Sequence, residues 1–309
     1  MRSVYLAQER GDHDSAFHMA QQLAATGNRR ALFFLGTAYA EGLGVTRDLD
    51  QADALFRRYV VTGGSSHARR SEADRAESVA NYYDDLPTDS VLGTANLVRA
   101  THWYQYAVEF GSTRALTKLA YRYRFGRGVP KNPEKALKLY RRAADSRTRF
   151  GVFADIGDLY LSGELGEVDF VSARKAYLEG VADNDWRSAF KLGNMYLDGV
   201  GVERDVHVAR AWWEIAAQIG HPIAPLHLMR GYLRGTFPEP NARVKGLAWF
   251  LVLYRLFDKS DEAVARGAAS YTGISPFSSE EIRDARRLAD RILYANPNLT
   301  RSGKFPIGL

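Results

Sequence analysis

Cysteine is absent from this sequence of 309 residues, which excludes a disulfide framework, a thiolate metal site and a cysteine nucleophile. No apolar run approaches the roughly 18–20 residues that a transmembrane helix needs, so we expect no membrane span. The first residues, MRSVYLAQERGDHDSAF, lack the apolar core of a signal peptide. We expect a cytoplasmic protein if Met1 is the true start, and a periplasmic or envelope protein if a signal segment was removed.

Motifs of catalysis and metal binding are also missing. None of the seven histidines pairs with another at the i, i+4 spacing of a helical metal site. The sequence has no G-x-S-x-G elbow and no Walker motif. The carboxylates of Asp84, Asp85 and Asp89 lack the ligand spacing of a calcium loop. We therefore expect no catalysis, no metal and no cofactor.

The sequence does contain an internal repeat with a period near 36 residues. A small residue, followed three or four places later by a large one, recurs at Ala16, Ala52, Ala100, Ala136, Ala173, Ala209 and Gly246. A tyrosine recurs at Tyr39, Tyr83, Tyr123, Tyr160, Tyr196 and Tyr232. Loop glycines in the same phase are Gly42, Gly126, Gly163, Gly199 and Gly235. Each period predicts two short helices and a turn, and neither helix can bury its apolar stripe alone.

The repeating pattern is L-G-x-x-Y, then G-x-G-V, then A-x-x-W-Y-x-x-A-A. It stands here as Leu35-Gly36-Thr37-Ala38-Tyr39 with Gly42-Leu43-Gly44-Val45, and again as Leu119-Ala120 with Tyr123, Gly126-Arg127-Gly128-Val129 and Ala136. This pattern resembles the Sel1-like repeat family, relatives of the tetratricopeptide repeat. The resemblance implies an all-α, right-handed α-solenoid of stacked antiparallel helix pairs. The G-x-G loops follow helix ends of the wrong polarity for an anion, so we interpret them as turns.

The positions of the repeats along the sequence predict how the chain is divided into segments. We expect an N-terminal half-repeat cap at 1–26, repeats over 27–245, capping helices at 246–296 and a tail at 297–309. The repeat at about 64–111 is degenerate and carries 12 extra residues, 48 − 36 in the alanine series. We place this extra length in connections, at 63–70 and 84–94, where insertions cost little.

Charge is unevenly distributed along the chain. Residues 111–150 hold 12 basic and two acidic side chains, a sum of +10, whereas the whole chain sums to +6. Arg114, Lys118 and Arg122 follow at i, i+4 and i+8, which places three like charges in one row. A solvated face usually mixes signs, so we expect an anionic partner, either an acidic protein segment or an anionic polysaccharide. Nothing resembles a nucleic-acid-binding module, and nucleic acid is not expected.

Known members of the Sel1-like family are mostly scaffolds for other proteins, many of them in bacterial envelope or secretion systems. The resemblance therefore implies a non-catalytic bacterial scaffold or adaptor that holds a protein or peptide on its concave face. The alternative is an envelope or secretion-system component that recognises an anionic polysaccharide through residues 111–150. By analogy with tetratricopeptide stacks, first helices line the concave face. The partner-binding residues expected from this analogy and from the basic row are Arg30, Arg114, Lys118, Tyr121, Arg122, Arg124, Arg187, Asn194 and Arg230.

Overall fold

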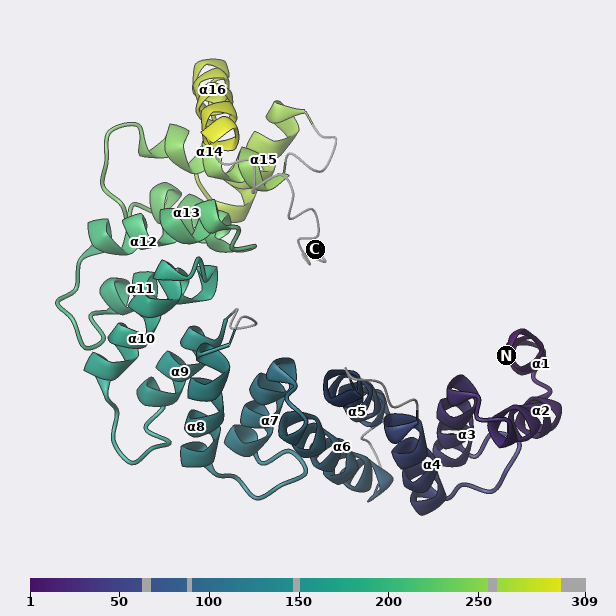
Figure 1. Cartoon of the computed structure of the whole chain (residues 1–309). Coiled ribbons are helices and arrows are strands. Elements are labelled where there is room, and N and C mark those ends of the chain that lie inside the picture. The colour runs from purple at the N-terminus through teal and green to yellow at the C-terminus, as the bar shows by residue number, and fades with distance from the viewer. Residues whose placement is uncertain (63–67, 88–90, 147–150, 255–259, 296–309) are drawn as a thin grey trace. The chain divides into compact units, whose positions relative to one another are not determined.

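The computed structural model of the chain describes residues 1–62, 68–87, 91–146, 151–254 and 260–295, and every regular element in these ranges is an α-helix (Figure 1). The chain forms two compact units, Met1–Arg147 and Thr148–Leu309. The first unit contains α1 (Arg2–Glu9), α2 (His13–Ala25), α3 (Arg29–Glu41), α4 (Leu49–Val61), α5 (Ala68–Asp85), α6 (Val91–Glu109), α7 (Thr113–Phe125) and α8 (Pro133–Ala144). The second contains α9 (Val152–Leu161), α10 (Phe170–Ala182), α11 (Trp186–Asp198), α12 (Val206–Ile219), α13 (Ala224–Leu233), α14 (Ala242–Tyr254), α15 (Asp261–Thr272) and α16 (Ser279–Ala295).

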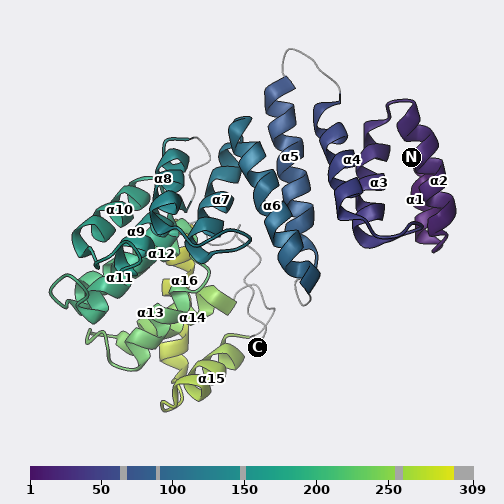
Figure 2. The ribbon, with the colours of Figure 1, turned by 90° about the horizontal axis from the view of Figure 1, so that it is seen from below.

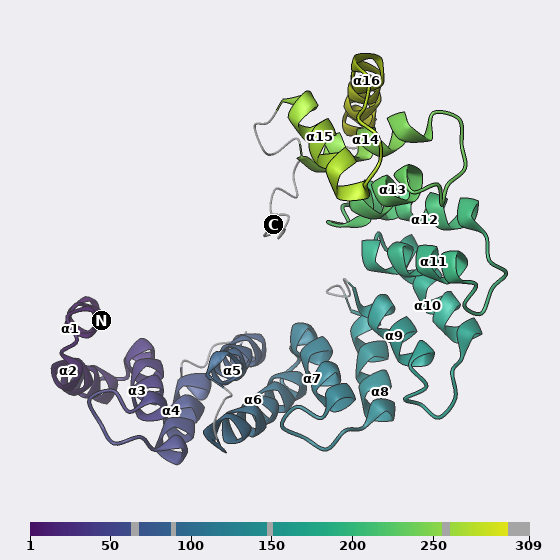
Figure 3. The ribbon, with the colours of Figure 1, turned by 180° about the vertical axis from the view of Figure 1, so that it is seen from behind.

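Consecutive helices form antiparallel pairs, and neighbouring pairs stack within each unit. Figure 2 shows α3, α4, α5 and α6 lying side by side in the first unit, and Figure 3 shows α10 to α13 stacked in the second. Short polar side chains start most of these helices. The carboxylate of Asp205, the N-cap residue of α12, accepts hydrogen bonds from the backbone N–H groups of His207 and Val208. Such caps each stabilise a helix by about 1 kcal/mol.

The repeated small residues lie where two helices approach most closely. The six alanines of the series, on the second helix of each pair, are at most 1% exposed. On the first helix, the glycine of the L-G-x-x-Y pattern faces an aromatic ring of its partner. A Cβ atom at Gly36 would lie 2.5 Å from the ring of Phe56, and one at Gly193 would lie 2.3 Å from Trp213. These two pairs therefore close around a residue without a side chain.

The two glycines of each G-x-G turn have different roles. The first ends the preceding helix in the left-handed conformation, as Gly42 does with φ 78°. The second approaches the previous helix pair. A Cβ atom at Gly44 would lie 2.3 Å from the carbonyl oxygen of His13 in α2, and one at Gly128 would lie 2.2 Å from that of Leu97 in α6. The motif is a packing element, as the sequence indicated.

The placement of the extra residues in connections was wrong. Helices α5 and α6 have 18 and 19 residues, against 13 in α3 and in α4, so 5 + 6 = 11 of the 12 extra residues lengthen helices. Helix α5 begins at Ala68, within the first expected insertion, and α6 begins at Val91, within the second. The physical reason is that the segment after Ala68 is rich in Ala, Arg and Glu, which favour helix. Residues 63–67 and 88–90 lie outside the described residues.

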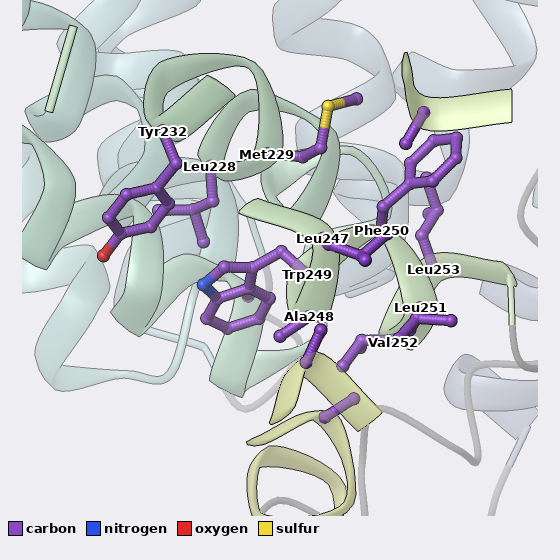
Figure 4. Close-up of a cluster of buried hydrophobic side chains, with 14 of the residues drawn as sticks. Leu228, Met229, Tyr232, Leu247, Ala248, Trp249, Phe250, Leu251, Val252 and Leu253 are labelled. Atoms are coloured by element: carbon purple, nitrogen blue, oxygen red, sulfur yellow. The ribbon is translucent and has the colours of Figure 1, made fainter. Parts of the chain in front are cut away.

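The C-terminal part also differs from the expected two helices. Helix α14 begins at Ala242, before the expected boundary at 246, and pairs with α13. A third helix, α15, was not predicted. Residues from Gly246 to Leu253 are all buried, and Figure 4 shows the side chains of α14 gathered with Leu228, Met229 and Tyr232 of α13. Helices α15 and α16 cover the rest of α14, and the tail at 297–309 lies outside the described residues.

Helix α16 starts with a side-chain cap. The hydroxyl of Ser278 accepts a hydrogen bond from the backbone N–H of Glu281, and the Glu281 carboxylate accepts one from the backbone N–H of Ser278. This reciprocal pair is a capping box. Within the ranges described, no helix is both long and apolar enough to cross a membrane.

Candidate partner-binding surface

The basic row of α7 faces an acidic and polar row on α5. The Arg114 guanidinium lies 2.9 Å from Asp74 and 3.3 Å from Glu77. The Lys118 ammonium donates a hydrogen bond of 2.7 Å to the side-chain oxygen of Asn81. These contacts join the first helices of two neighbouring pairs. Arg114 and Lys118, which suggested an anionic partner, therefore already contact acidic and polar side chains of this chain.

Arg122, the third member of the row, is a structural residue, and its assignment to a binding surface was wrong. Its side chain is 2% exposed, and its guanidinium lies 2.5 Å from the Asp84 carboxylate. It also donates hydrogen bonds to the carbonyl oxygens of Leu97 and Arg127 and to the Thr101 hydroxyl. The side chain thus ties α7 and the turn after it to α5 and α6, and a partner cannot reach it.

The second unit contains the same arrangement. The Arg187 guanidinium on α11 lies 2.7 Å from Asp155, and the Lys191 ammonium lies 2.8 Å from Asp158, both on α9. Burial by itself lowers the pKa of Arg187, but the hydrogen bond and charge of Asp155 raise it above its usual value. Arg187 therefore stays charged and joins two first helices.

Asn194 belongs to a second repeated contact. Two residues before each of three repeat tyrosines, a side-chain oxygen accepts a hydrogen bond from the aromatic residue on the partner helix. Asn194 accepts from the indole N–H of Trp213 at 3.0 Å, and Asp158 accepts from the Tyr177 hydroxyl at 2.6 Å. Asn81 accepts from the Tyr104 hydroxyl at 2.7 Å. Asn194 thus holds a helix pair together.

The remaining predicted positions differ in their surroundings. Arg30 is exposed at the start of α3. Arg124 is buried, with its guanidinium 5.0 Å from the centre of the Phe125 ring. Arg230 is half-buried and lies 4.9 Å from the ring of Tyr271 on α15. Of the nine predicted residues, six lie in the first unit and three, Arg187, Asn194 and Arg230, lie in the second.

Tyr121 is the predicted residue that best fits a contact surface. It is 45% exposed, and its ring packs against that of Phe125 with centroids 4.6 Å apart. Phe125, one turn further along α7, is 50% exposed. The sequence analysis did not select Phe125, although its i+4 spacing from Tyr121 places both on one side of the helix. We call Tyr121 and Phe125 the α7 aromatic pair.

The titratable groups of these surfaces form contacts between helices. In the part of the chain that the structure describes, no group of three His, Asp or Glu side chains is placed to hold a metal ion. Burial, followed by the charge of Asp84, raises the pKa of Tyr104, so its hydroxyl stays protonated as a hydrogen-bond donor. The titratable groups along α5 and α7 thus hold helices together.

Comparison with known proteins supports the repeat assignment. The family model described as Sel1 repeat matches residues 29–58, 92–110, 113–147 and 186–221. The Arabidopsis thaliana proteins HRD3A and HRD3B, both ERAD-associated E3 ubiquitin-protein ligase components, are each 32% identical to the chain over 85 residues. Those 85 residues are 28% of this chain but only 12% of HRD3A and 14% of HRD3B.

Two solved structures resemble the fold. One is c5321, a protective antigen of uropathogenic Escherichia coli strains with an SLR fold, which is 22% identical with a TM-score of 0.54 over 96% of this chain and 60% of its own. The other is a Sel1 repeat protein from Oxalobacter formigenes, 24% identical with a TM-score of 0.53 over 80% of this chain and 93% of its own. At these identities the likeness concerns the fold alone. The chain is thus similar to the Sel1 repeat in four segments, which agrees with the resemblance seen in the sequence.

Proposed function

We propose that the chain is a non-catalytic scaffold or adaptor that holds a partner protein or peptide on the face lined by its first helices. The Sel1 repeats and the distant similarity to the HRD3 ligase components fit a protein-interaction scaffold. Repeat stacks of this kind present extended surfaces to other proteins. The proposal adds where on the chain the partner is held.

The observation that carries the proposal is the α7 aromatic pair. Two large apolar side chains, each about half exposed, lie side by side on a first helix. Tyrosine and other aromatic residues are enriched among the side chains that contribute most to protein interfaces. The pair therefore suits a partner segment that offers an apolar side chain.

The polysaccharide alternative has less support. It relied on the basic side chains of residues 111–150, and of these Arg114 and Lys118 contact Asp74, Glu77 and Asn81, and Arg122 is buried. A carbohydrate would have to displace these contacts. An aromatic pair anchors an apolar group of a protein at no such cost.

The test is affinity capture with the full chain, followed by measurement of the captured partner's affinity. We expect the double variant Y121A/F125A to bind its partner at least about tenfold more weakly, since each truncated anchor typically costs 1 kcal/mol or more. The matched control is V171A/L178A, which removes two exposed apolar side chains from the second helix α10. Equal binding by the wild type and Y121A/F125A contradicts the proposal.

A further inference from the structure

Helix α8 carries a second basic row, which the sequence analysis did not separate from the first. Lys135, Lys138 and Arg142 follow at i, i+3 and i+7, so they lie on one side of the helix, over about 10 Å. All three side chains are exposed. We call these three residues the α8 basic row. The opposite side of α8 is buried and packs on α7.

The surroundings of this row differ from those of the row on α7. Lys135 donates a hydrogen bond of 2.7 Å to the Tyr123 hydroxyl, which is uncharged. Within the described residues, neither Lys138 nor Arg142 forms an ion pair. Glu134 and Asp145, at the two ends of α8, are the only acidic residues in 126–146. Like charges at these spacings destabilise a helix, so an anionic group placed along the row would relieve their repulsion.

We propose that the α8 basic row binds an acidic helical segment of a partner protein, whose carboxylates recur at i, i+3, i+4 and i+7. The inference rests on the proposed scaffold function and adds a second surface, on a second helix, to the α7 aromatic pair. Its basis is that the other basic rows of this chain lie against a helix with acidic or polar side chains. Arg114 and Lys118 of α7 lie against α5, and Arg187 and Lys191 of α11 lie against carboxylates of α9.

The side chains on α8 favour an acidic helix over other anions. Binding of single-stranded nucleic acid relies on exposed aromatic side chains that stack on bases. The aromatic residue of α8, Tyr140, is buried. An amphipathic helix enters a membrane surface through a wide apolar face, whereas Leu137 and the other apolar side chains of α8 are half-buried or buried. Point charges at helical spacing match carboxylates at helical spacing.

The test uses the full chain and two synthetic helical peptides of identical composition. The first carries glutamates at i, i+3, i+4 and i+7, and in the second the same glutamates are distributed around the helix. Binding is measured by fluorescence anisotropy at low ionic strength, where exposed charges are least screened. We expect the first peptide to bind more tightly, and the variant K135E/K138E/R142E to weaken its binding about tenfold or more. Raising the salt concentration should also weaken it.

The matched control is R283E/R287E/R291E, which reverses three exposed arginines at i, i+4 and i+8 on α16 with the same change in net charge. It should leave binding unchanged, and circular dichroism verifies that both variants are folded. Equal binding of the two peptides, or an equal loss in both variants, overturns the proposal. So does tighter binding of phosphatidylserine vesicles or of alginate through the same residues. Y121A/F125A should bind the first peptide normally, which distinguishes failure of this inference from failure of the α7 surface.

Discussion

At the scale of single residues, the two glycines of a G-x-G turn have separable roles. Gly42 and Gly44 both have positive φ, so alanine at either costs about 1–2 kcal/mol in backbone conformation. A Cβ atom at Gly42 would lie 3.4 Å from the nearest atom, in ordinary contact, whereas one at Gly44 would lie 2.3 Å from the His13 carbonyl oxygen. We expect G44A to lower the urea midpoint clearly more than G42A. Equal effects would mean that backbone conformation alone explains both glycines.

His221 makes stability depend on pH. Its ring is 4% exposed, and its Nδ1 atom accepts hydrogen bonds from the backbone N–H groups of Ile223 and Ala224 at the start of α13. Burial, followed by the charge of His227, lowers the pKa of His221 from 6.5 to about 4. The unfolded chain therefore binds the proton more readily than the folded chain, so protonation favours unfolding.

The stabilisation linked to His221 is present above about pH 6.5 and is lost as pH falls towards 4, by at most about 3 kcal/mol. We expect the melting temperature to fall over this window and the variant H221N, which keeps an acceptor that does not titrate, to flatten the fall. Burial also lowers the pKa of His227, so some dependence should remain. The exposed-histidine control, H102N, should follow the wild type, and an unchanged slope in H221N contradicts the assignment.

At the scale of helices, two arginines of one row should have unequal effects on stability. Arg122 is 2% exposed, and its removal takes away the ion pair with Asp84 and one donor to each of the carbonyl groups of Leu97 and Arg127. Arg114 is 60% exposed, and exposed ion pairs contribute about 1 kcal/mol or less. We expect R122A to lower the free energy of unfolding by about 3 kcal/mol and R114A by less than about 1 kcal/mol. Chemical denaturation measures both, and a larger loss in R114A would reverse our account of the row.

Helix pairs and their register were predictable because they depend on short-range periodicity. A buried alanine, an aromatic residue four places later and a glycine at the turn recur whatever the neighbouring repeat contains. The lengthened α5 and α6 were missed because the break in period was read as loop, although the sequence after Ala68 favours helix. Helix α15 was missed because it does not follow the repeat, and its Gly267 weakens the helical pattern.

What the basic side chains of α7 contact could not be predicted from the sequence of α7 alone. Whether a basic row faces solvent or an acidic row depends on which faces of two helices meet, and those helices are about 40 residues apart. One signal was available: Asp74 lies nine residues before Tyr83, as Arg114 lies nine residues before Tyr123. Comparing the charges of successive repeats at equal phase would have paired these two residues.

At the scale of the whole molecule, the repeats make stability a local property. Each helix pair packs mainly on its neighbours in sequence, as α4 does on α5 and α6 on α7. In such stacks, stability is close to a sum of repeat and nearest-neighbour terms. A substitution should therefore loosen its own pair and the adjacent ones, with an effect that fades along the chain.

Hydrogen exchange of the full-length variants R122A and H221N tests whether the effect of a substitution decreases along the chain. Arg122 contacts α5 and α6, so R122A should reduce backbone protection most in α5, α6 and α7, and less in α1 and α2. H221N changes the start of α13, so H221N at pH 5 should alter protection most in α12, α13 and α14. Each variant is the control for the other, because both are measured on the same peptides. A uniform change along the chain in either variant would instead show that the protein unfolds as one cooperative body.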